Sequence, residues 1–364
     1  MRKEPLFQEA AAAYPFCGKI VSISPYGGGH INDTYLAVCD DGAEFVLQHI
    51  NSYVFKHPDE IMENIIGVTR FIADKLTARG EDASRSTLTV ISAKDGKDFY
   101  VDSEGEYWRV TVNIPNTTAY DFVESADMLK KSGAAFGNFQ SMLADYPAET
   151  LHETIPHFHD TPDRYRQLED AIRDNKSGRL GDVAAEIEFA AARKADCAVL
   201  MDLLAKGELP LKVTHNDTKM SNVLIDNDSG DAVCVIDLDT VMPGLTAFDY
   251  GDSIRAGATT AAEDEVDLSK VHFDLDLFKA YTEGFLGTAG AALTETEIKT
   301  LPIGAKLMTF EVGIRFLADY LNGDVYFKTK YPQHNLDRAR NQFHLVKEME
   351  EKWDEMMAVV EAYL

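Results

Sequence analysis

The sequence lacks a long run of hydrophobic residues, and it has few cysteines. No apolar stretch approaches the roughly 18 residues that a membrane span needs, and the first residues lack the apolar core of a signal peptide. The four cysteines follow neither a Cys-x-x-Cys pattern nor a disulfide-like spacing; they are Cys17, Cys39, Cys197 and Cys234. These absences favour a reducing compartment, so we expect a cytoplasmic protein.

Positive charge is also scarce. Lys and Arg number 35 against 61 Asp and Glu, which gives a net charge of −26 at pH 7. A surface this acidic repels nucleic acid and anionic membranes, so we expect neither as a partner. No obligate protein partner is evident. The length of 364 residues, with 45% hydrophobic residues, suffices for a globular protein of two domains or lobes.

The most informative stretch lies between Val213 and Arg255. Two short apolar segments, 222–225 and 232–236, flank a turn rich in Asn, Asp, Ser and Gly, which predicts a β-hairpin. Polar residues cluster just before the first strand and just after the second. We therefore expect the hairpin to bring Asp217, Asn222 and Asp237 toward one another.

The residue types in this stretch suit phosphoryl transfer, which needs metal ions to neutralise charge and a group that orients the attacking hydroxyl. Asp217 is the predicted base, with His215 two residues before it and Asn222 five residues after it. Asn222 and Asp237 are the predicted Mg²⁺ ligands, because this ion favours hard oxygen ligands. Lys219 is predicted to stabilise the γ-phosphoryl charge, or to pair with Asp217 and keep it ionised.

These residues resemble the aminoglycoside phosphotransferase and choline kinase family, and most closely its branch that phosphorylates N-acetylhexosamines. The resemblance spans essentially the whole chain. It implies a protein-kinase-like α/β (α+β) fold, and transfer of the γ-phosphate of ATP to the anomeric hydroxyl of N-acetylglucosamine or N-acetylgalactosamine. The motifs that carry it are Val213-Thr-His-Asn-Asp-Thr-Lys219, Ile236-Asp-Leu-Asp-Thr240, Met242-Pro-Gly244, Phe248-Asp-Tyr-Gly-Asp-Ser-Ile-Arg255 and Phe316-Leu-Ala-Asp-Tyr-Leu321.

Two lobes are expected: a small antiparallel-sheet lobe over 1–114 and a larger, mainly helical lobe over 115–364. Apolar alternation predicts strands at 19–23, 34–39, 44–50, 87–91, 98–101 and 107–112. Helical spacing predicts helices at 4–14, 59–80, 126–146, 161–174, 184–204, 273–285, 294–321 and 338–363. His157-Phe-His159-Asp160 is predicted to be a loop and helix N-cap rather than a metal cluster. Asp249 is predicted to cap the helix that follows it.

A glycine-rich turn, residues 26–33, separates the first two predicted strands. Glycine lets backbone N–H groups approach a phosphate closely, because it has no Cβ and tolerates a positive φ. In a kinase-like fold this turn would cover ATP. Gly27, Gly28 and Gly29 are therefore predicted nucleotide contacts.

Gln48 stands where many of these kinases have a phosphate-pairing lysine. It is a candidate nucleotide contact without charge, or an ordinary strand residue. Val112 and Ile114 belong to the expected connector between the lobes, whose backbone hydrogen-bonds the adenine in related kinases. The resemblance therefore adds both to the predicted nucleotide site.

The predicted sugar contacts centre on the helix 310–321 and the turn after it. Arg315 and Asp319 are four residues apart, so they share a face that contacts the sugar or holds an ion pair. Tyr326 is predicted to stack on the sugar ring or hydrogen-bond to it. The other predicted substrate contacts are His30, Asn32 and Asp217.

Two alternatives stay open. One is a kinase of the same family that acts on choline, homoserine or an aminoglycoside. The other is a pseudokinase that binds ligand without turnover. Gln48 in place of lysine favours the pseudokinase, whereas the set Asp217, Asn222 and Asp237 argues against it.

Overall fold

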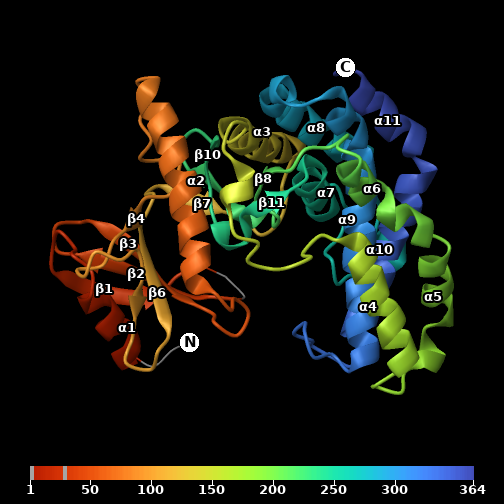
Figure 1. Ribbon diagram of the computed structural model, residues 1–364, viewed down its shortest axis with the longest axis horizontal. Helices are drawn as coiled ribbons and strands as arrows, with labels where there is room; N and C mark the ends of the chain where they lie inside the picture. Colours follow the sequence, from red (N-terminus) through yellow and green to blue (C-terminus); the bar gives the residue numbers. More distant parts are fainter. Residues whose placement is uncertain (1–3, 28–30) are drawn as a thin grey trace. The chain divides into compact units, whose positions relative to one another are not determined.

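The computed structural model describes residues 4–27 and 31–364, and the chain divides into two compact units (Figure 1). Unit 1 comprises Met1–Thr118, Asp145–Pro156 and Leu224–Met242. Unit 2 comprises Ala119–Ala144, His157–Val223 and Pro243–Leu364. Unit 1 thus includes two segments from later in the chain. The lobe boundary at residue 114 stays a prediction.

Unit 1 is built on an antiparallel sheet in the order β1-β2-β3-β6-β4, with β5 paired to β6. The mixed α/β class and the antiparallel sheet are as predicted. Buried and half-buried side chains alternate along β2, as expected for a strand with one covered face. The strands are β1 (Ile20–Pro25), β2 (Asp33–Cys39), β3 (Glu44–Ile50), β4 (Val90–Ile91), β5 (Tyr100–Val101) and β6 (Tyr107–Val112).

Helix α1 (Glu4–Ala12) contributes to the core on one face of this sheet. Leu6 and Ala10 pack with Tyr35, Leu47 and Trp108 in one buried apolar cluster. Strand β4 is shorter than the predicted strand 87–91. The backbone N–H groups of residues 86 and 87 both donate to the carbonyl of residue 83, so a turn occupies the first part of that segment.

Helix α2 (Pro58–Ala78) begins with proline and two acidic residues in its first turn, which suits a helix N-terminus. Its apolar stripe is buried, and Gly80 follows its end with a φ of 75°. Asn64 on α2 donates to the carbonyl oxygens of His152 and Val241, both at 2.9 Å. One side chain therefore ties two later segments of the chain to unit 1.

The predicted hairpin is present as β9 (Val223–Asp226) and β10 (Ala232–Val235), which are neighbours in a sheet with β7 (Thr117–Ala119). Asp226 organises the turn: its carboxylate accepts the N–H groups of Asp228 and Ser229 at 3.0 and 2.9 Å. These bonds, together with Arg85, lower the pKa of Asp226 to about 2. The carboxylate thus stays ionised at neutral pH.

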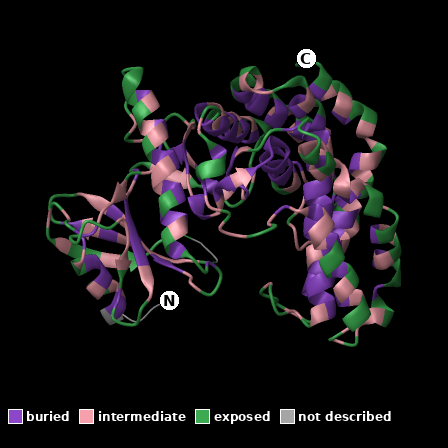
Figure 2. Cartoon of the chain, viewed as in Figure 1, coloured by how far each residue is buried: buried purple, intermediate pink, exposed green. Residues whose placement is uncertain are grey.

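Unit 2 is mainly helical around α9 (Glu295–Asn322), a helix of 28 residues whose side chains are mostly buried (Figure 2). A capping box of Thr294 and Glu297 begins this helix. A two-stranded sheet joins β8 (Lys212–Thr214) to β11 (Met242–Gly244). The other helices are α3 (Ala126–Met142), α4 (Thr161–Asp174), α5 (Ala184–Ala191), α6 (Val199–Ala205), α7 (Thr246–Gly257), α8 (Leu275–Ala289), α10 (His334–Glu351) and α11 (Trp353–Glu361).

Two long helices predicted from spacing are each divided in the structure. Residues 184–204 form α5, a 3₁₀ turn over Lys194–Ala198, and α6, while the predicted helix 338–363 lies in α10 and α11. Apolar residues three apart fit a 3₁₀ turn and an α-helix alike, so the spacing does not reveal these interruptions.

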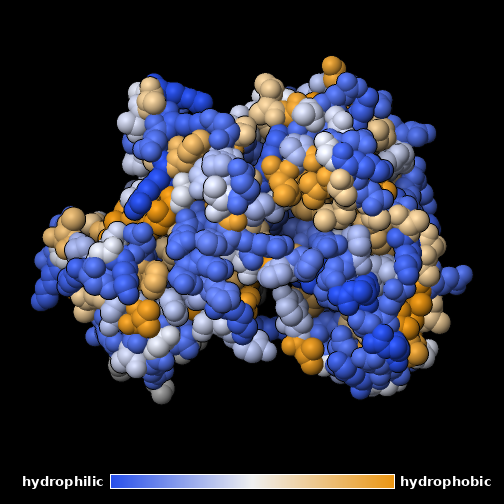
Figure 3. Space-filling model, viewed as in Figure 1, coloured by the Kyte–Doolittle hydropathy of each residue, from blue (hydrophilic) through white to orange (hydrophobic). Residues whose placement is uncertain are grey.

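Hydrophilic residues cover much of the face in Figure 3, in keeping with the 26% of charged residues. None of the described helices is long and apolar enough to cross a membrane.

Helices α3 and α8 approach each other closely through glycines. A Cβ at Gly284 on α8 would lie 1.9 Å from the carbonyl oxygen of Lys130, and a Cβ at Gly133 on α3 would lie 2.5 Å from that of Tyr281. Real Cβ atoms do not approach backbone atoms so closely, so glycine is required at both positions.

We expect Gly284→Ala to destabilise the protein by about 1–3 kcal/mol or more, because the added methyl forces the two helices apart. Gly287→Ala on the same helix is the matched control, since a Cβ there meets nothing within 4 Å. Alanine favours a helix over glycine by about 0.5–1 kcal/mol, so the control should gain stability. Urea unfolding of both variants measures the difference, and equal midpoints would contradict the packing explanation.

Candidate active site

A loop after β8 carries His215, Asn216 and Asp217, and a buried carboxylate shapes it. Asp249 on α7 is fully buried, and it accepts the backbone N–H groups of His215 at 2.9 Å and Asn216 at 2.7 Å. The side-chain amide of Gln140 donates a third hydrogen bond at 2.8 Å. Asn216 has a φ of 63°, a left-handed conformation that asparagine tolerates well.

The prediction that Asp249 caps the following helix is wrong. Helix α7 begins at Thr246, so Asp249 lies within its first turn. There its carboxylate binds backbone N–H groups of the loop rather than those of its own helix. The sequence motif alone does not show which backbone N–H groups donate hydrogen bonds to this carboxylate.

The other side of the loop is also bound to α7. Asp252 accepts the backbone N–H of Thr218 at 3.0 Å, and the Thr218 hydroxyl donates to the Asp249 carbonyl at 2.5 Å. Ser253 donates its hydroxyl to the Thr218 carbonyl at 2.6 Å. Arg255 forms an ion pair with Asp252, which compensates the charge of that carboxylate. Helix α7 thus holds the loop backbone on both sides of Asp217.

A buried imidazole links the loop to α9. His159 lies 3.0 Å from Glu311 through Nδ1 and donates through Nε2 to the Asn216 carbonyl at 3.1 Å. That carbonyl only accepts, so Nε2 carries a proton, and Nδ1 faces the carboxylate. Burial raises the pKa of Glu311, but His159 outweighs it, so the net shift is downward. The pair is therefore a buried contact between an imidazole and an ionised carboxylate.

The segment around His159 behaves as predicted. Asp160 is the N-cap of α4, where its side chain accepts the N–H of Asp163 at 3.1 Å. His157 and His159 point to different partners: His157 pairs with Asp160 at 2.9 Å. The contact of His159 with the loop was not predicted from the sequence, because His159 and Asn216 are 57 residues apart.

Asp217 sits within a small network of its own. Lys219 Nζ donates to Asp217 Oδ2 at 2.9 Å, and Asn222 Nδ2 donates to the same oxygen at 3.1 Å. Burial raises the pKa of Asp217. The charge and hydrogen bond of Lys219, together with the hydrogen bond from Asn222, lower the pKa by more than burial raises it, so the net shift is downward. Asp217 is therefore ionised at neutral pH, with a third of its side chain exposed (33%).

The two predicted Mg²⁺ ligands, Asn222 and Asp237, each carry a side-chain oxygen of a type that a hard divalent cation accepts. Asn222 uses Nδ2 on the Asp217 carbonyl, at 2.7 Å, and on its carboxylate, which leaves the amide oxygen for an ion. Asp237 follows β10 in unit 1, has a φ of 60° and is half-buried. One amide oxygen and one carboxylate are ligand types that Mg²⁺ accepts.

Gln48 is hydrogen-bonded to Arg109, a cation that was not predicted as part of the site. The β3–β6 register places Gln48 opposite Arg109, whose Nε donates to the Gln48 side-chain oxygen at 2.9 Å. Arg109 also pairs with Asp239, and both side chains are only 4% exposed. Gln48 Nε2 in turn donates to Thr34 at 3.1 Å. An arginine in the middle of the apolar strand 107–112 is the signal that could have identified this cation.

Asn32 belongs to the same cluster. Its amide nitrogen donates to Asp239 at 2.5 Å, and its amide oxygen accepts the N–H of Asn51 at 3.0 Å. Gly27 has a φ of 72°, so the turn does use the freedom of glycine there. The other predicted residues of the turn, Gly28, Gly29 and His30, lie outside the described residues.

The predicted adenine-contacting segment is partly engaged within unit 1. The Val112 N–H donates to the Thr89 carbonyl at 2.9 Å. The Ile114 carbonyl accepts the hydroxyl of Thr117 at 2.8 Å. The adenine contacts of both residues stay a prediction.

Three of the predicted substrate contacts, Arg315, Asp319 and Tyr326, lie in the last part of α9 and in the turn after it. The guanidinium of Arg315 lies 5.5 to 6.0 Å from the ring centroids of three aromatic residues, which are Phe158, Tyr326 and Phe327. Among the described residues Arg315 forms no ion pair, so the alternative pairing with Asp319 does not occur. The Tyr326 side chain is mostly exposed.

Asp319 organises the turn that carries Tyr326. Its Oδ1 accepts the N–H groups of Val325 and Tyr326, and its Oδ2 accepts the N–H of Phe327 and an amide N–H of Asn335, all at 2.9 to 3.0 Å. Two hydrogen bonds on each oxygen occupy this buried carboxylate. Asp319 therefore positions Tyr326, and a direct contact between Asp319 and a ligand stays a prediction.

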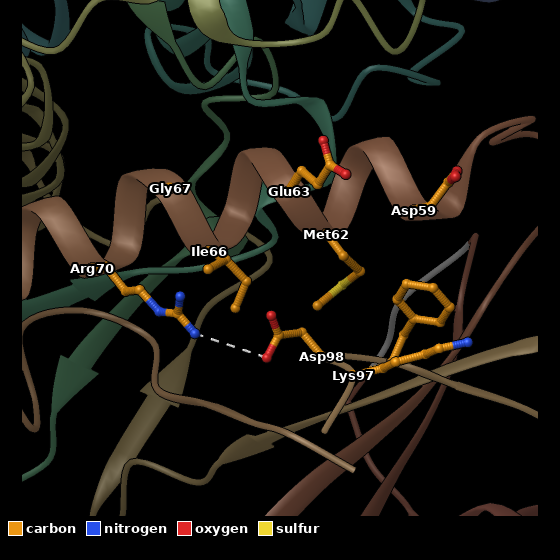
Figure 4. Close-up of a pocket in the computed structure, with 9 residues that line it drawn as sticks. Asp59, Met62, Glu63, Ile66, Gly67, Arg70, Lys97 and Asp98 are labelled. Atoms are coloured by element: carbon orange, nitrogen blue, oxygen red, sulfur yellow. Dashed lines mark ion pairs between the residues drawn. The ribbon is translucent and has the colours of Figure 1, made fainter. Parts of the chain in front are cut away.

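A surface pocket of about 400 Å³ lies elsewhere in unit 1, between α2 and the segment before β5 (Figure 4). Arg70 and Asp98 face each other across it at 3.9 Å, and Met62 and Ile66 form its apolar wall. No predicted site residue lines this pocket, so we assign it no part in the candidate active site.

A small unit with an antiparallel sheet and a helical unit with this loop define a protein-kinase-like fold. The sequence profile of the phosphotransferase enzyme family matches residues 22–284, more than half of the chain. The protein therefore belongs to this phosphotransferase family, as the resemblance predicted.

Solved structures with the same fold include kinases of several small molecules. A microcompartment-associated aminopropanol kinase has a TM-score of 0.66 at 16% identity, covering 96% of this chain and 97% of its own. An aminoglycoside phosphotransferase from Alicyclobacillus acidocaldarius has a TM-score of 0.64 at 12% identity, covering 98% and 96%. Amicoumacin kinase in complex with AMP-PNP, Ca²⁺ and its antibiotic has a TM-score of 0.55 at 15% identity, covering 94% and 91%.

We expect Arg109→Met to destabilise the protein by about 3–5 kcal/mol, because it leaves the buried carboxylate of Asp239 without a counter-charge. Chemical unfolding monitored by circular dichroism measures this loss. The double variant Arg109→Met/Asp239→Leu should recover much of it, since no buried charge remains. A double variant no more stable than the single variant would contradict the pairing as the cause.

Proposed function

We propose that the protein is an N-acetylhexosamine 1-kinase, which transfers the γ-phosphate of ATP to the anomeric hydroxyl of N-acetylglucosamine or N-acetylgalactosamine. The observation that carries this proposal is an ionised, partly exposed Asp217 on a loop whose backbone is bound by Asp249. Membership of the phosphotransferase family supports the reaction type. The sugar acceptor follows from the motif resemblance and from the chemistry around Arg315.

In this reaction Asp217 orients the anomeric hydroxyl and accepts its proton. The sugar oxygen forms a bond to the γ-phosphorus as the bond from that phosphorus to the β–γ bridging oxygen breaks, which releases ADP. A divalent cation, when bound, neutralises charge on the phosphates, and Asn222 and Asp237 would hold it. Lys219 keeps Asp217 ionised in the free enzyme and can donate to the transferring phosphoryl group.

For the nucleotide, we propose that the glycine turn and the segment from Val112 to Ile114 contact ATP. Amicoumacin kinase, which shares the fold, binds AMP-PNP with Ca²⁺. Gln48 shares its amide with Arg109 and Thr34, so the role of the usual lysine would fall partly to Arg109. A neutral amide and a charge-compensated guanidinium attract phosphate less than a lysine does, which increases the dependence on the cation.

The positive charge of Arg315 near the end of α9 is the main argument for the type of acceptor. A sugar ring suits aromatic rings and convergent hydrogen-bond donors. Arg315 supplies donors beside Phe158, Tyr326 and Phe327. A trimethylammonium or a polyamine would need those rings without a cation among them, because like charges repel. The group around Arg315 therefore favours a neutral acceptor over choline or an aminoglycoside.

We expect turnover of N-acetylglucosamine and N-acetylgalactosamine to their 1-phosphates when ATP and Mg²⁺ are supplied. ADP release over a panel with glucose, choline, homoserine, aminopropanol and kanamycin measures acceptor choice, and phosphorus NMR identifies the phosphorylated position. Asp217→Asn should lower kcat by about 10²–10⁴-fold, because the base is lost while hydrogen bonds from Lys219 and Asn222 remain possible.

Each other outcome of the panel would lead to a different assignment of acceptor or activity. Turnover of choline, homoserine, aminopropanol or kanamycin alone would keep the Asp217 chemistry and overturn the sugar assignment. No turnover of any acceptor, with ATP still bound, would establish a pseudokinase. An Asp217→Asn variant with near-normal kcat would exclude Asp217 as the base.

We expect Lys219→Met to move the acid limb of the kcat/KM profile to higher pH. Lys219 lowers the pKa of Asp217, and its removal lets burial raise that pKa, so the carboxylate takes up a proton at a higher pH than before. In the wild-type chain the lowered pKa means that ionised Asp217 contributes stability above its ordinary pKa, and this contribution is lost as the pH falls through the folded-state pKa. Rates measured from about pH 4.5 to 8 reveal the shift.

The exposed Lys206→Met on the same unit is the control, and its acid limb should not move. If Lys219→Met lowers kcat without moving the acid limb, Lys219 acts on the phosphoryl group alone and does not tune Asp217.

A further inference from the structure

Three potential metal ligands converge in unit 2, and none of them is a residue assigned to phosphoryl transfer. His272 lies shortly before α8, and His344 and Glu348 are four residues apart on α10, so they share one face of that helix. One nitrogen of each histidine and one carboxylate oxygen all lie within 4.8 Å of one another. The three side chains come from two segments more than 70 residues apart.

The hydrogen bonds of His272 determine which of its nitrogens faces the group. Nε2 lies 3.1 Å from the carbonyl oxygen of Ser269, which can only accept, so Nε2 carries the proton of a neutral ring. Nδ1 then presents a lone pair to Glu348 Oε1 at 2.8 Å. Two acceptors at this distance require a cation between them, either a second proton on the ring or a metal ion. Metal-binding histidines in proteins are held by such a backbone contact.

His344 supplies the second lone pair. Its Nε2 is shielded from solvent, has no hydrogen-bond partner among the described residues, and lies 3.4 Å from Glu348 Oε1. Two ligand atoms on one tetrahedral Zn²⁺ are roughly 3.3 Å apart, because each lies about 2.0–2.1 Å from the ion. The spacings of 2.8 and 3.4 Å around Oε1 therefore suit a shared ion.

The remaining contacts orient the carboxylate. Oε2 of Glu348 accepts the backbone N–H of Phe273 at 2.8 Å and lies 3.3 Å from Lys352 Nζ. Lys352 also donates to the Phe273 carbonyl at 2.6 Å. These bonds occupy Oε2 and leave Oε1 directed at the imidazoles. The positive charge of Lys352 opposes a second cation, but it lies on the other oxygen.

We propose that His272 Nδ1, His344 Nε2 and Glu348 Oε1 form a binding site for a first-row divalent transition metal ion such as Zn²⁺, with water as the further ligand. Two imidazoles and a carboxylate suit Zn²⁺, Ni²⁺ or Cu²⁺, whereas Mg²⁺ prefers oxygen ligands throughout. The ion would link the segment before α8 to α10, so its role is structural. The site is independent of the proposed kinase reaction, and so is its test.

The test is equilibrium dialysis of the chelator-treated full chain against Zn²⁺, with Mg²⁺ in excess to occupy oxygen-ligand sites and no nucleotide. Bound metal is measured by mass spectrometry, and Co²⁺ absorption in the visible reports nitrogen ligation. We expect one Zn²⁺ per chain and a rise in Tm on binding. His272→Gln and His344→Gln should each weaken Zn²⁺ binding by about 10–100-fold or more.

His152→Gln is the matched control. His152 pairs with one carboxylate, Glu63, at 2.7 Å, and it is not part of the three-ligand group. Its loss should leave Zn²⁺ binding unchanged. Because the two histidine variants keep the bonds of Glu348 to Phe273 and Lys352, they are expected to fold, which circular dichroism verifies.

Two results would overturn the proposal. If the wild-type chain takes up no Zn²⁺, the cation between His272 and Glu348 is a proton, and the group is an ordinary ion pair. If His272→Gln and His344→Gln bind Zn²⁺ as tightly as the wild-type chain, the ion is bound elsewhere.

Discussion

The candidate active site depends on one buried carboxylate. Asp249 receives two backbone N–H groups of the loop after β8 and one side-chain amide, and these bonds shape the backbone that carries Asp217. A buried carboxylate without such donors would be strongly unfavourable, so the loop and the carboxylate stabilise each other. Asn216 takes up a left-handed backbone conformation within this arrangement. The exposed part of Asp217 can then face a reactant while its backbone stays rigid.

Other buried carboxylates in the two units are paired with basic side chains. His159 and Glu311 join α9 to the loop carbonyl, and Arg109 and Asp239 join β6 to the segment after the hairpin. Each pair gains little net stability over an apolar substitute, but removal of one partner leaves a costly buried charge. Such pairs bring together segments that are distant in the sequence, among them the loop that carries Asp217.

The fold does not decide the acceptor. Proteins of this fold include kinases of aminopropanol and of amicoumacin at 15 to 16% identity, so one scaffold serves different acceptors. The acceptor proposed for this protein rests on the side chains at the end of α9, where Arg315 lies among aromatic rings and Asp319 binds the turn of Tyr326. The proposal of a neutral sugar acceptor depends on the charge of this group rather than on the architecture.

The sequence by itself determined the local features: the β9–β10 hairpin, the antiparallel sheet of unit 1, most helices and the motif around Asp217, since periodicity and motif spacing act over a few residues. It did not reveal the breaks within the helical segments 184–204 and 338–363. Only the tertiary structure decided that Asp249 binds the loop, that His159 contacts Asn216, and that Arg109 accompanies Gln48. The Arg109–Asp239 pair spans 130 residues. The sequence gives the charge of each residue. The partner of that charge depends on how elements distant in the sequence pack together, and no local sequence pattern predicts that packing.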